Sequence, residues 1–231
     1  MAHHQFDEQI FAMTGFDATS NSAVGFGDAT GRELASEWLS SGAKELINTL
    51  PPQCLYSVAS DATALTDGNG STINNCRVLG VTRKDKYSLK HLPCREVYQS
   101  DLGKATPGSG YMEEAFSEDP VFYKKSNKIF VLPEPSATYP ALINTVTFPT
   151  VNRNGTSIEG FPDELESLVI MFAVIRAVEH ELANNQDTEL SNELLRTYKG
   201  DYFQGLDSYL KFYGLSSAQI APSQQQEQGA V

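Results

Sequence analysis

The most strongly patterned part of the chain is a segment that is apolar on every side, from Leu168 to Ile175. It follows Pro162, which is tolerated at a first helical position, and carboxylates that favour the positive end of a helix dipole. The pattern predicts a helix at about 162–184 that is packed on several sides. A bilayer-spanning helix needs about 20 apolar residues, whereas this run stops at Arg176. Because the chain has few other helices, we expect neighbouring subunits to supply part of the cover.

Two more helices follow from apolar spacing. Thr30 and Glu33 form a capping box, and Pro51-Pro52 ends the apolar repeat that follows, which predicts a helix at about 31–50. Near the C-terminus, apolar residues recur every four positions and Gly214 is suited to a helix end, which predicts a helix at about 188–213. The repeating residues are Leu190, Leu194, Tyr198, Tyr202, Leu206 and Leu210.

Between the first and second helices the apolar period changes to that of strands. Residues 77–83 alternate, residues 120–133 read as two strands joined near Ser126-Asn127, and residues 141–148 form another strand bracketed by prolines. Loops rich in Gly, Ser, Asp and Pro separate them. This segment predicts a small antiparallel domain of four to six strands.

The predicted fold class is α+β, a helical bundle with an inserted antiparallel β domain. Residues 30–52 and 160–214 would form the bundle, and residues 53–159 the insertion. Residues 1–29 are expected to be an extended arm with a short helical turn near Phe6–Met13. Residues 215–231 are expected to be a flexible tail, because Ser, Gln, Ala and Pro bury too little apolar surface to fold.

Composition excludes several functions. The net charge of −12 argues against binding nucleic acid by phosphate neutralisation. The N-terminus lacks the basic and apolar regions of a secretory signal. Cys54, Cys76 and Cys94 are odd in number and widely spaced, so we expect reduced thiols packed as small hydrophobic groups.

No motif predicts catalysis. His180 begins a near match to the zinc-protease pattern, but Asn184 stands at its second ligand position. Neither a nucleophile elbow nor a phosphate-binding turn is present. A glycosidase or a calcium site could use the acidic cluster Glu113, Glu114, Glu118 and Asp119, which otherwise reads as a solvated loop. We therefore expect no enzyme, no cofactor and no metal.

The last helix is aromatic on more than one side, which fits either core packing or a subunit interface, where tyrosine is enriched. The residues that we consider for an interface, drawn from the second and third helices, are Phe172, Ile175, Tyr198, Tyr202, Tyr209 and Tyr213. The excess of apolar surface favours an oligomer.

Three segments, residues 37–51, 119–133 and 161–173, together resemble the head-to-tail connector (adaptor or neck) proteins of tailed bacteriophages in their order and spacing. The resemblance spans about residues 30–213 and contains no single specific motif. It implies a structural protein of the virion neck, assembled in the host cytoplasm.

The resemblance also implies a ring of about twelve copies under the portal protein, which extends the channel for double-stranded DNA and seats a tail or nozzle protein, without a membrane. The terminus that reaches the portal would be the C-terminal tail, including Ile220, Pro222, Gln224 and Gln226. Acidic residues expected to face the channel are Glu179, Glu181, Asp187, Glu189 and Glu193.

Three alternatives remain open from the sequence. One is another tail, baseplate or head-surface component with the same combination of helices and strands. The second is a hydrolase that uses the acidic loop at 113–119. The third is a carbohydrate-binding module centred on the β region.

Overall fold

The computed structural model describes residues 4–15, 29–60, 62–184 and 188–215, without the side chains of residues 29–33, 181, 184 and 188–191. The fold is α+β, as expected, with five α-helices and two four-stranded sheets in this described part. The chain divides into two compact units. The helical unit comprises Met1–Cys54 and Phe148–Val231, and the β unit comprises Leu55–Thr147.

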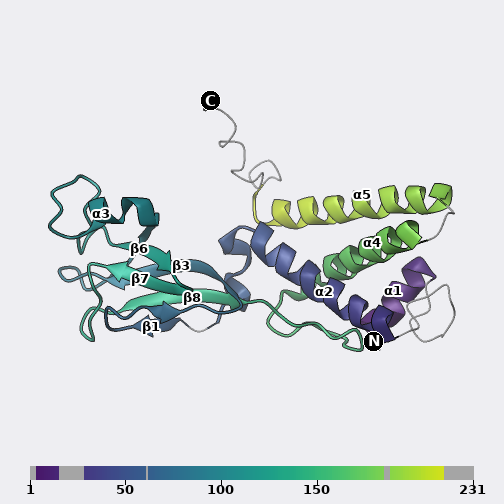
Figure 1. Cartoon of the computed structure of the whole chain (residues 1–231), viewed down its shortest axis with the longest axis horizontal. Coiled ribbons are helices and arrows are strands. Elements are labelled where there is room, and N and C mark those ends of the chain that lie inside the picture. Colours follow the sequence, from purple (N-terminus) through teal and green to yellow (C-terminus); the bar gives the residue numbers. More distant parts are fainter. Residues whose placement is uncertain (1–3, 16–28, 61, 185–187, 216–231) are drawn as a thin grey trace, which may run out of the picture. The chain divides into compact units, whose positions relative to one another are not determined.

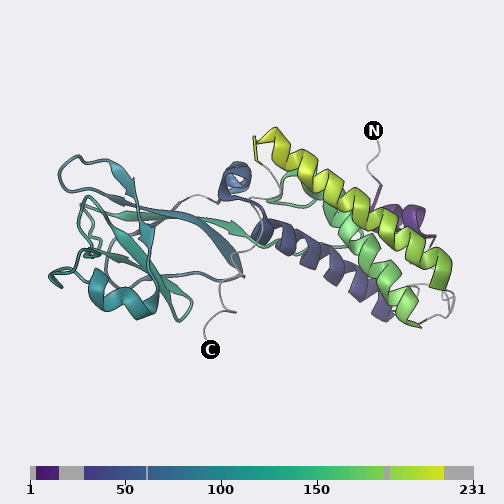
Figure 2. The same ribbon diagram turned by 90° about the horizontal axis from the view of Figure 1, so that it is seen from above.

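The helical unit is organised around α4 (Glu166–Asn184), which lies between α2 (Ala29–Thr49) and α5 (Thr188–Phe212) in Figures 1 and 2. These boundaries lie close to the predicted ones for α2 and α5. The expected first turn at Pro162 is instead a short 3-10 helix, Asp163–Leu165, and the α-helix begins after it. As expected, α2 ends before Pro51-Pro52, and Gly214 has the left-handed φ of 72°.

The apolar run of α4 is enclosed within a single chain, which corrects the expectation that neighbouring subunits must cover it. From Leu168 to Val178 every side chain except Met171 and Arg176 is buried. Helices α1, α2 and α5 all pack against α4. Two of these contacts are close because of glycine. A Cβ on Gly42 of α2 would lie 2.8 Å from Phe172, and one on Gly205 of α5 would lie 2.7 Å from Leu168.

The third cover of α4 is a helix that is longer than the sequence predicted. Residues 6–14, expected to be part of an extended arm with a short helical turn near Phe6–Met13, form α1 (Phe6–Thr14). Phe6 and Ile10 are buried, and Gln5 and Glu8 form a capping box at its start. Only the remaining arm residues 1–3 and 16–28 lie outside the described part of the chain, as do the side chains of the predicted Thr30–Glu33 capping box.

The segment that leads from the β unit back to α4 belongs with the helices, although residues 148–159 were expected in the β insertion. Val151 is buried, and its backbone N–H donates to Ser40 Oγ of α2 at 2.9 Å. Arg153 pairs with the buried Asp7 of α1 at 3.1 Å. These polar contacts place the boundary at Thr147/Phe148.

The β unit contains two sheets with the strand orders β1-β8-β3-β4 and β2-β7-β6-β5. The first sheet comprises β1 (Thr63–Leu65), β8 (Ala141–Thr147), β3 (Cys76–Lys84) and β4 (His91–Pro93). The second comprises β2 (Ser71–Thr72), β7 (Lys128–Leu132), β6 (Val121–Lys125) and β5 (Arg95–Glu96). The expected four to six antiparallel strands are therefore eight, and β5 pairs with β6 in parallel.

The two sheets share one core, to which both contribute alternate residues. Val81, Ala141 and Ile143 from the first sheet pack with Phe122, Ile129 and Val131 from the second. The predicted hairpin at Ser126-Asn127 joins β6 and β7, and both residues have positive φ, as a two-residue hairpin turn requires. A short helix, α3 (Leu102–Ala105), follows β5 (Figure 1).

Candidate functional site

Exposed hydrophobic side chains gather in two loops of the β unit, residues 85–90 and 111–118, which we call the braced loops. Tyr87 is 73% exposed and Met112 fully exposed. Leu89, Tyr111 and Phe116 are also more than half exposed. Tyr98, after β5, adds another exposed ring. Large apolar side chains that gather on a surface mark a binding site more often than single ones do.

The two braced loops are tied together by a polar network at their bases. Ser117 Oγ donates to the Asp85 carboxylate at 2.6 Å and accepts a hydrogen bond from the Lys86 backbone N–H at 2.8 Å. The same carboxylate accepts from the backbone N–H groups of Tyr87 and Ser88. Since Tyr87 and Phe116 each lie next to a bonded residue, the network fixes the backbone beneath two exposed rings.

Charge stabilises this network. Asp85 is buried, and its bonds from Ser117 and Ser88 hold the pKa of its carboxyl well below the usual range. The buried Arg83 guanidinium lies within 3.3–3.4 Å of Ser117 Oγ and the backbone oxygens of Lys84 and Glu134. Burial lowers the pKa of Arg83, which Asp85 partly offsets. A buried ionic group thus ties the two loops to each other, and the buried Ala115 also anchors the second loop in an apolar cluster with Val97 and Ala105.

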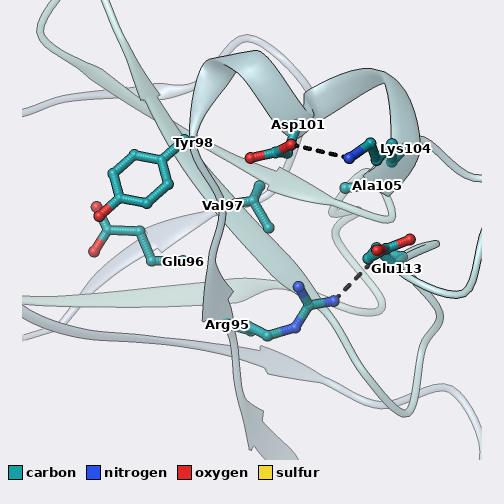
Figure 3. Close-up of a pocket in the computed structure, with 8 residues that line it drawn as sticks. All are labelled: Arg95, Glu96, Val97, Tyr98, Asp101, Lys104, Ala105 and Glu113. Atoms are coloured by element: carbon teal, nitrogen blue, oxygen red, sulfur yellow. Dashed lines mark hydrogen bonds and ion pairs between the residues drawn. The ribbon is translucent and has the colours of Figure 1, made fainter. Parts of the chain in front are cut away.

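A pocket of about 310 Å³ lies between β5 and α3, and Figure 3 shows the eight residues that line it. Its buried apolar residues are Val97 and Ala105. Most of its charged side chains are engaged, because Lys104 pairs with Asp101 at 3.4 Å and Glu96 pairs with Lys124 at 2.9 Å. Arg95 reaches the Glu113 backbone oxygen and the Asp119 carboxylate. The remaining lining residue is Tyr98.

This pocket holds no Ser–His or Cys–His pair for nucleophilic hydrolysis. None of its lining residues is a Ser, Cys or His. Of the acidic cluster considered for a hydrolase, Glu114 accepts from the Gly108 and Gly110 backbone and Asp119 pairs with Arg95, so both shape the loop. The three cysteines are free thiols, as expected, and burial raises the pKa of Cys94 to about 12.

The predicted channel-facing acidic residues are only partly described. Glu193 is exposed on α5. Glu179 is half-buried and pairs with both Arg176 and Lys199 at 2.9 Å, and these pairs outweigh its desolvation and lower its pKa. The side chains of Glu181, Asp187 and Glu189 lie outside the described part of the chain. The structure therefore brings none of these carboxylates together in a described site.

The residues considered for a subunit interface are mostly interior. Phe172, Ile175 and Tyr202 are buried within the helical unit, so core packing replaces the interface interpretation for these three. The hydroxyls of Tyr198 and Tyr209 donate to backbone oxygens of Met13 and Cys54 in the same unit. Tyr213 is the exception, with 39% of its surface exposed.

Other predicted features have plain placements. The His180 ring packs at 5.8 Å from the Trp38 ring, on the side of α4 that faces α2. Ile220, Pro222, Gln224 and Gln226 lie outside the described residues. No group of three potential metal ligands occurs among the residues that the structure describes. Across the same residues, no helix has the length and apolar character needed to cross a membrane.

Comparison of the sequence with protein-family models found no match, and comparison with curated proteins found none either.

The braced loops are the feature that sequence reasoning missed. Their hydrophobic residues follow neither a helical nor a strand period, and Asp85 and Ser117 are 32 positions apart. A usable signal was the gathering of Tyr111, Met112 and Phe116 in a stretch otherwise rich in Gly and acidic residues.

Proposed function

We propose that this protein is a non-enzymatic structural component of a phage virion, a head-to-tail connector that forms a ring below the portal. The ring would extend the DNA channel and provide the seat of the tail. The resemblance of residues 37–51, 119–133 and 161–173 to connector proteins supports this function. In this proposal α2, α4 and α5 act as a helical bundle whose core is complete in each copy.

The observation that carries the proposal is the hydrophobic surface of the braced loops. Five large apolar side chains there are more than half exposed, while the network of Asp85 and Ser117 holds their backbone in place. A preorganised apolar surface loses little conformational entropy on binding, which suits a permanent protein contact. A structural protein that must assemble requires such a surface, whereas a catalytic protein of this size requires a convergent polar site.

The charge of the chain suits a channel wall. A net charge of −12 repels DNA phosphates, so DNA can move past without being held. Because Glu179 is engaged by Arg176 and Lys199, the exposed Glu193 is the better candidate of these two for facing DNA. The contact of the C-terminal tail with the portal remains part of the proposal.

The test is assembly of the full-length protein, with and without portal protein, followed by negative-stain microscopy and sedimentation. We expect rings, or a complex with the portal. Met112→Ser with Phe116→Ser should abolish the assembly and leave the circular dichroism spectrum unchanged, whereas Phe11→Ser on α1, 45% exposed, should assemble normally. A protein that stays monomeric even with portal present contradicts the proposal, and rings that ignore the portal indicate another tail or baseplate component.

A further inference from the structure

The charges of the chain are divided unevenly between its two units. The helical unit contains 19 acidic and 7 basic residues, which gives −12, while the β unit contains 10 of each, which gives zero. Two helical units of such charge repel each other when they approach. Side-by-side contact of helical units is therefore disfavoured, and contact between a helical unit and a β unit is not.

The basic residues of the helical unit are largely occupied by its own carboxylates. Four of the seven form ion pairs, namely Arg153, Arg176, Lys199 and Lys211. Lys44 lies over the Phe148 ring. By contrast, Glu37 and Glu45 of α2 are exposed and take part in none of the ion pairs found among the described residues. With Ser41 between them they form one exposed row, spaced four residues apart and about 12 Å long.

The first braced loop has the opposite character. Lys86 and Lys90 are exposed on either side of the exposed Tyr87 and Leu89, and His91 follows. The Asp85 backbone N–H donates to the Lys90 oxygen at 2.8 Å, so the loop is a closed turn that presents both lysines as one positive surface. Of the two braced loops only the first is positive, because the second carries Glu113, Glu114 and Glu118.

We infer that the first braced loop of one copy docks on the exposed α2 row of the next copy, with Lys86 and Lys90 against Glu37 and Glu45 and with Tyr87 and Leu89 supplying apolar contact. Such a contact joins two different surfaces, so it continues from copy to copy and closes into a ring when the rotation permits. The inference rests on the proposed self-assembly and specifies its chemistry.

Charge reversal on each surface tests this contact in the full-length protein. Variant one carries Lys86→Glu and Lys90→Glu, and variant two carries Glu37→Lys and Glu45→Lys. We expect each variant alone to assemble about ten-fold more weakly than wild type or worse. The matched control, Lys125→Glu with Lys128→Glu in the β6–β7 turn, has the same charge change as variant one and should assemble like wild type. Circular dichroism verifies that all three fold.

Combining the reversals tests whether these two surfaces bind each other. A quadruple variant that carries all four reversals restores opposite charges at the contact and should regain assembly. In an equimolar mixture of variants one and two, copies of the same variant repel, whereas both contacts between the two variants join opposite charges. The mixture should therefore regain assembly, with the two variants alternating, and sedimentation should show it. High salt should weaken wild-type assembly because it screens the pairs.

Three results would overturn the inference. They are normal assembly of variant one, continued loss of assembly in the folded quadruple variant, and a wild-type protein that stays monomeric while it binds vesicles of anionic lipid. If wild type forms rings and variant one does so equally, only this contact is wrong. If wild type forms no assembly with or without portal, the proposed function fails with it.

Discussion

Residues 168–178 of α4 and residues 87–116 of the β unit both contain large hydrophobic side chains, but the structure treats them in opposite ways. The first stretch is almost wholly buried by three helices of its own chain. The second keeps Tyr87, Tyr98 and Met112 in contact with solvent and holds its loops with a buried ionic group. The exposed apolar surface that could bind a partner thus lies where the sequence is least periodic, whereas the most apolar segment is buried and stabilises the fold.

The largest effect is expected where the core of the helical unit is opened. Phe172→Ala should lower the free energy of unfolding by about 3–5 kcal/mol, because the ring is 8% exposed and fills the space against Gly42. Urea unfolding at two protein concentrations measures this loss, which should not depend on concentration. Phe212→Ala on α5, where the ring is 83% exposed, is the control and should change stability little. A concentration-dependent loss for Phe172→Ala would restore the interface interpretation.

The next effect concerns the hydrogen-bond network of Asp85 and Ser117 that ties the braced loops together. Ser117→Ala should cost about 1.5–3 kcal/mol, since the hydroxyl donates to a charged carboxylate. Urea unfolding followed by a signal from the β unit measures it. Ser100→Ala, whose hydroxyl reaches the exposed Asp101 at 3.3 Å, should cost much less. Equal losses of unfolding free energy in the two variants would show that the Asp85 network contributes no more than an exposed hydrogen bond.

The network of Asp85 and Ser117 also predicts that stability depends on pH. The folded pKa of Asp85 is lowered from the ordinary value of 3.8, chiefly by its hydrogen bond from Ser117, so its stabilisation is present above about 3.8 and is lost as pH falls below that value. Asp85→Asn should be less stable than wild type at neutral pH, and the difference should shrink in acid. Urea midpoints across this range measure it, and a difference that grows in acid would contradict the assignment.

A smaller effect on stability distinguishes two glycines of α5, one packed closely against α4 and one with open space around it. Gly205→Ala should destabilise by about 1–2 kcal/mol, because the new methyl group would lie 2.7 Å from the buried Leu168. Gly200→Ala, with nothing within 4 Å, should stabilise by about 0.5–1 kcal/mol through helix propensity. Thermal unfolding of both variants measures the two signs, and stabilisation by both would mean that α4 and α5 pack less closely than described.

The parts of the fold that sequence could predict are those with local signals. The ends of α2 and α5 follow from Pro51 and Gly214, and the β6–β7 hairpin follows from Ser126-Asn127 between alternating residues. The missed elements are the short strands β1, β2, β4 and β5. Helix α1, expected only as a short turn, has nine residues and is stabilised by packing on α4. Strands of two or three residues show no period, and their pairing is set by distant partners.

The candidate site could not be predicted for a similar reason. Asp85 looked like one loop carboxylate among many until the fold placed Ser117 beside it. Phe172 and Tyr202 suggested an interface because periodicity reveals apolar faces without revealing what covers them. The local sequence thus predicts which faces are apolar, and tertiary contacts determine which of them are buried.

The chain segments at the beginning and at the end of the β unit are hydrogen-bonded to each other. The Ser60 backbone N–H donates to the Thr145 oxygen at 2.9 Å, so the ends of residues 55–147 begin and finish as neighbours. A module with adjacent ends can be removed and replaced by a short linker, or transplanted into another host, without stretching either piece. The chain therefore has the layout of one folded domain inserted within another, and each part can be exchanged separately.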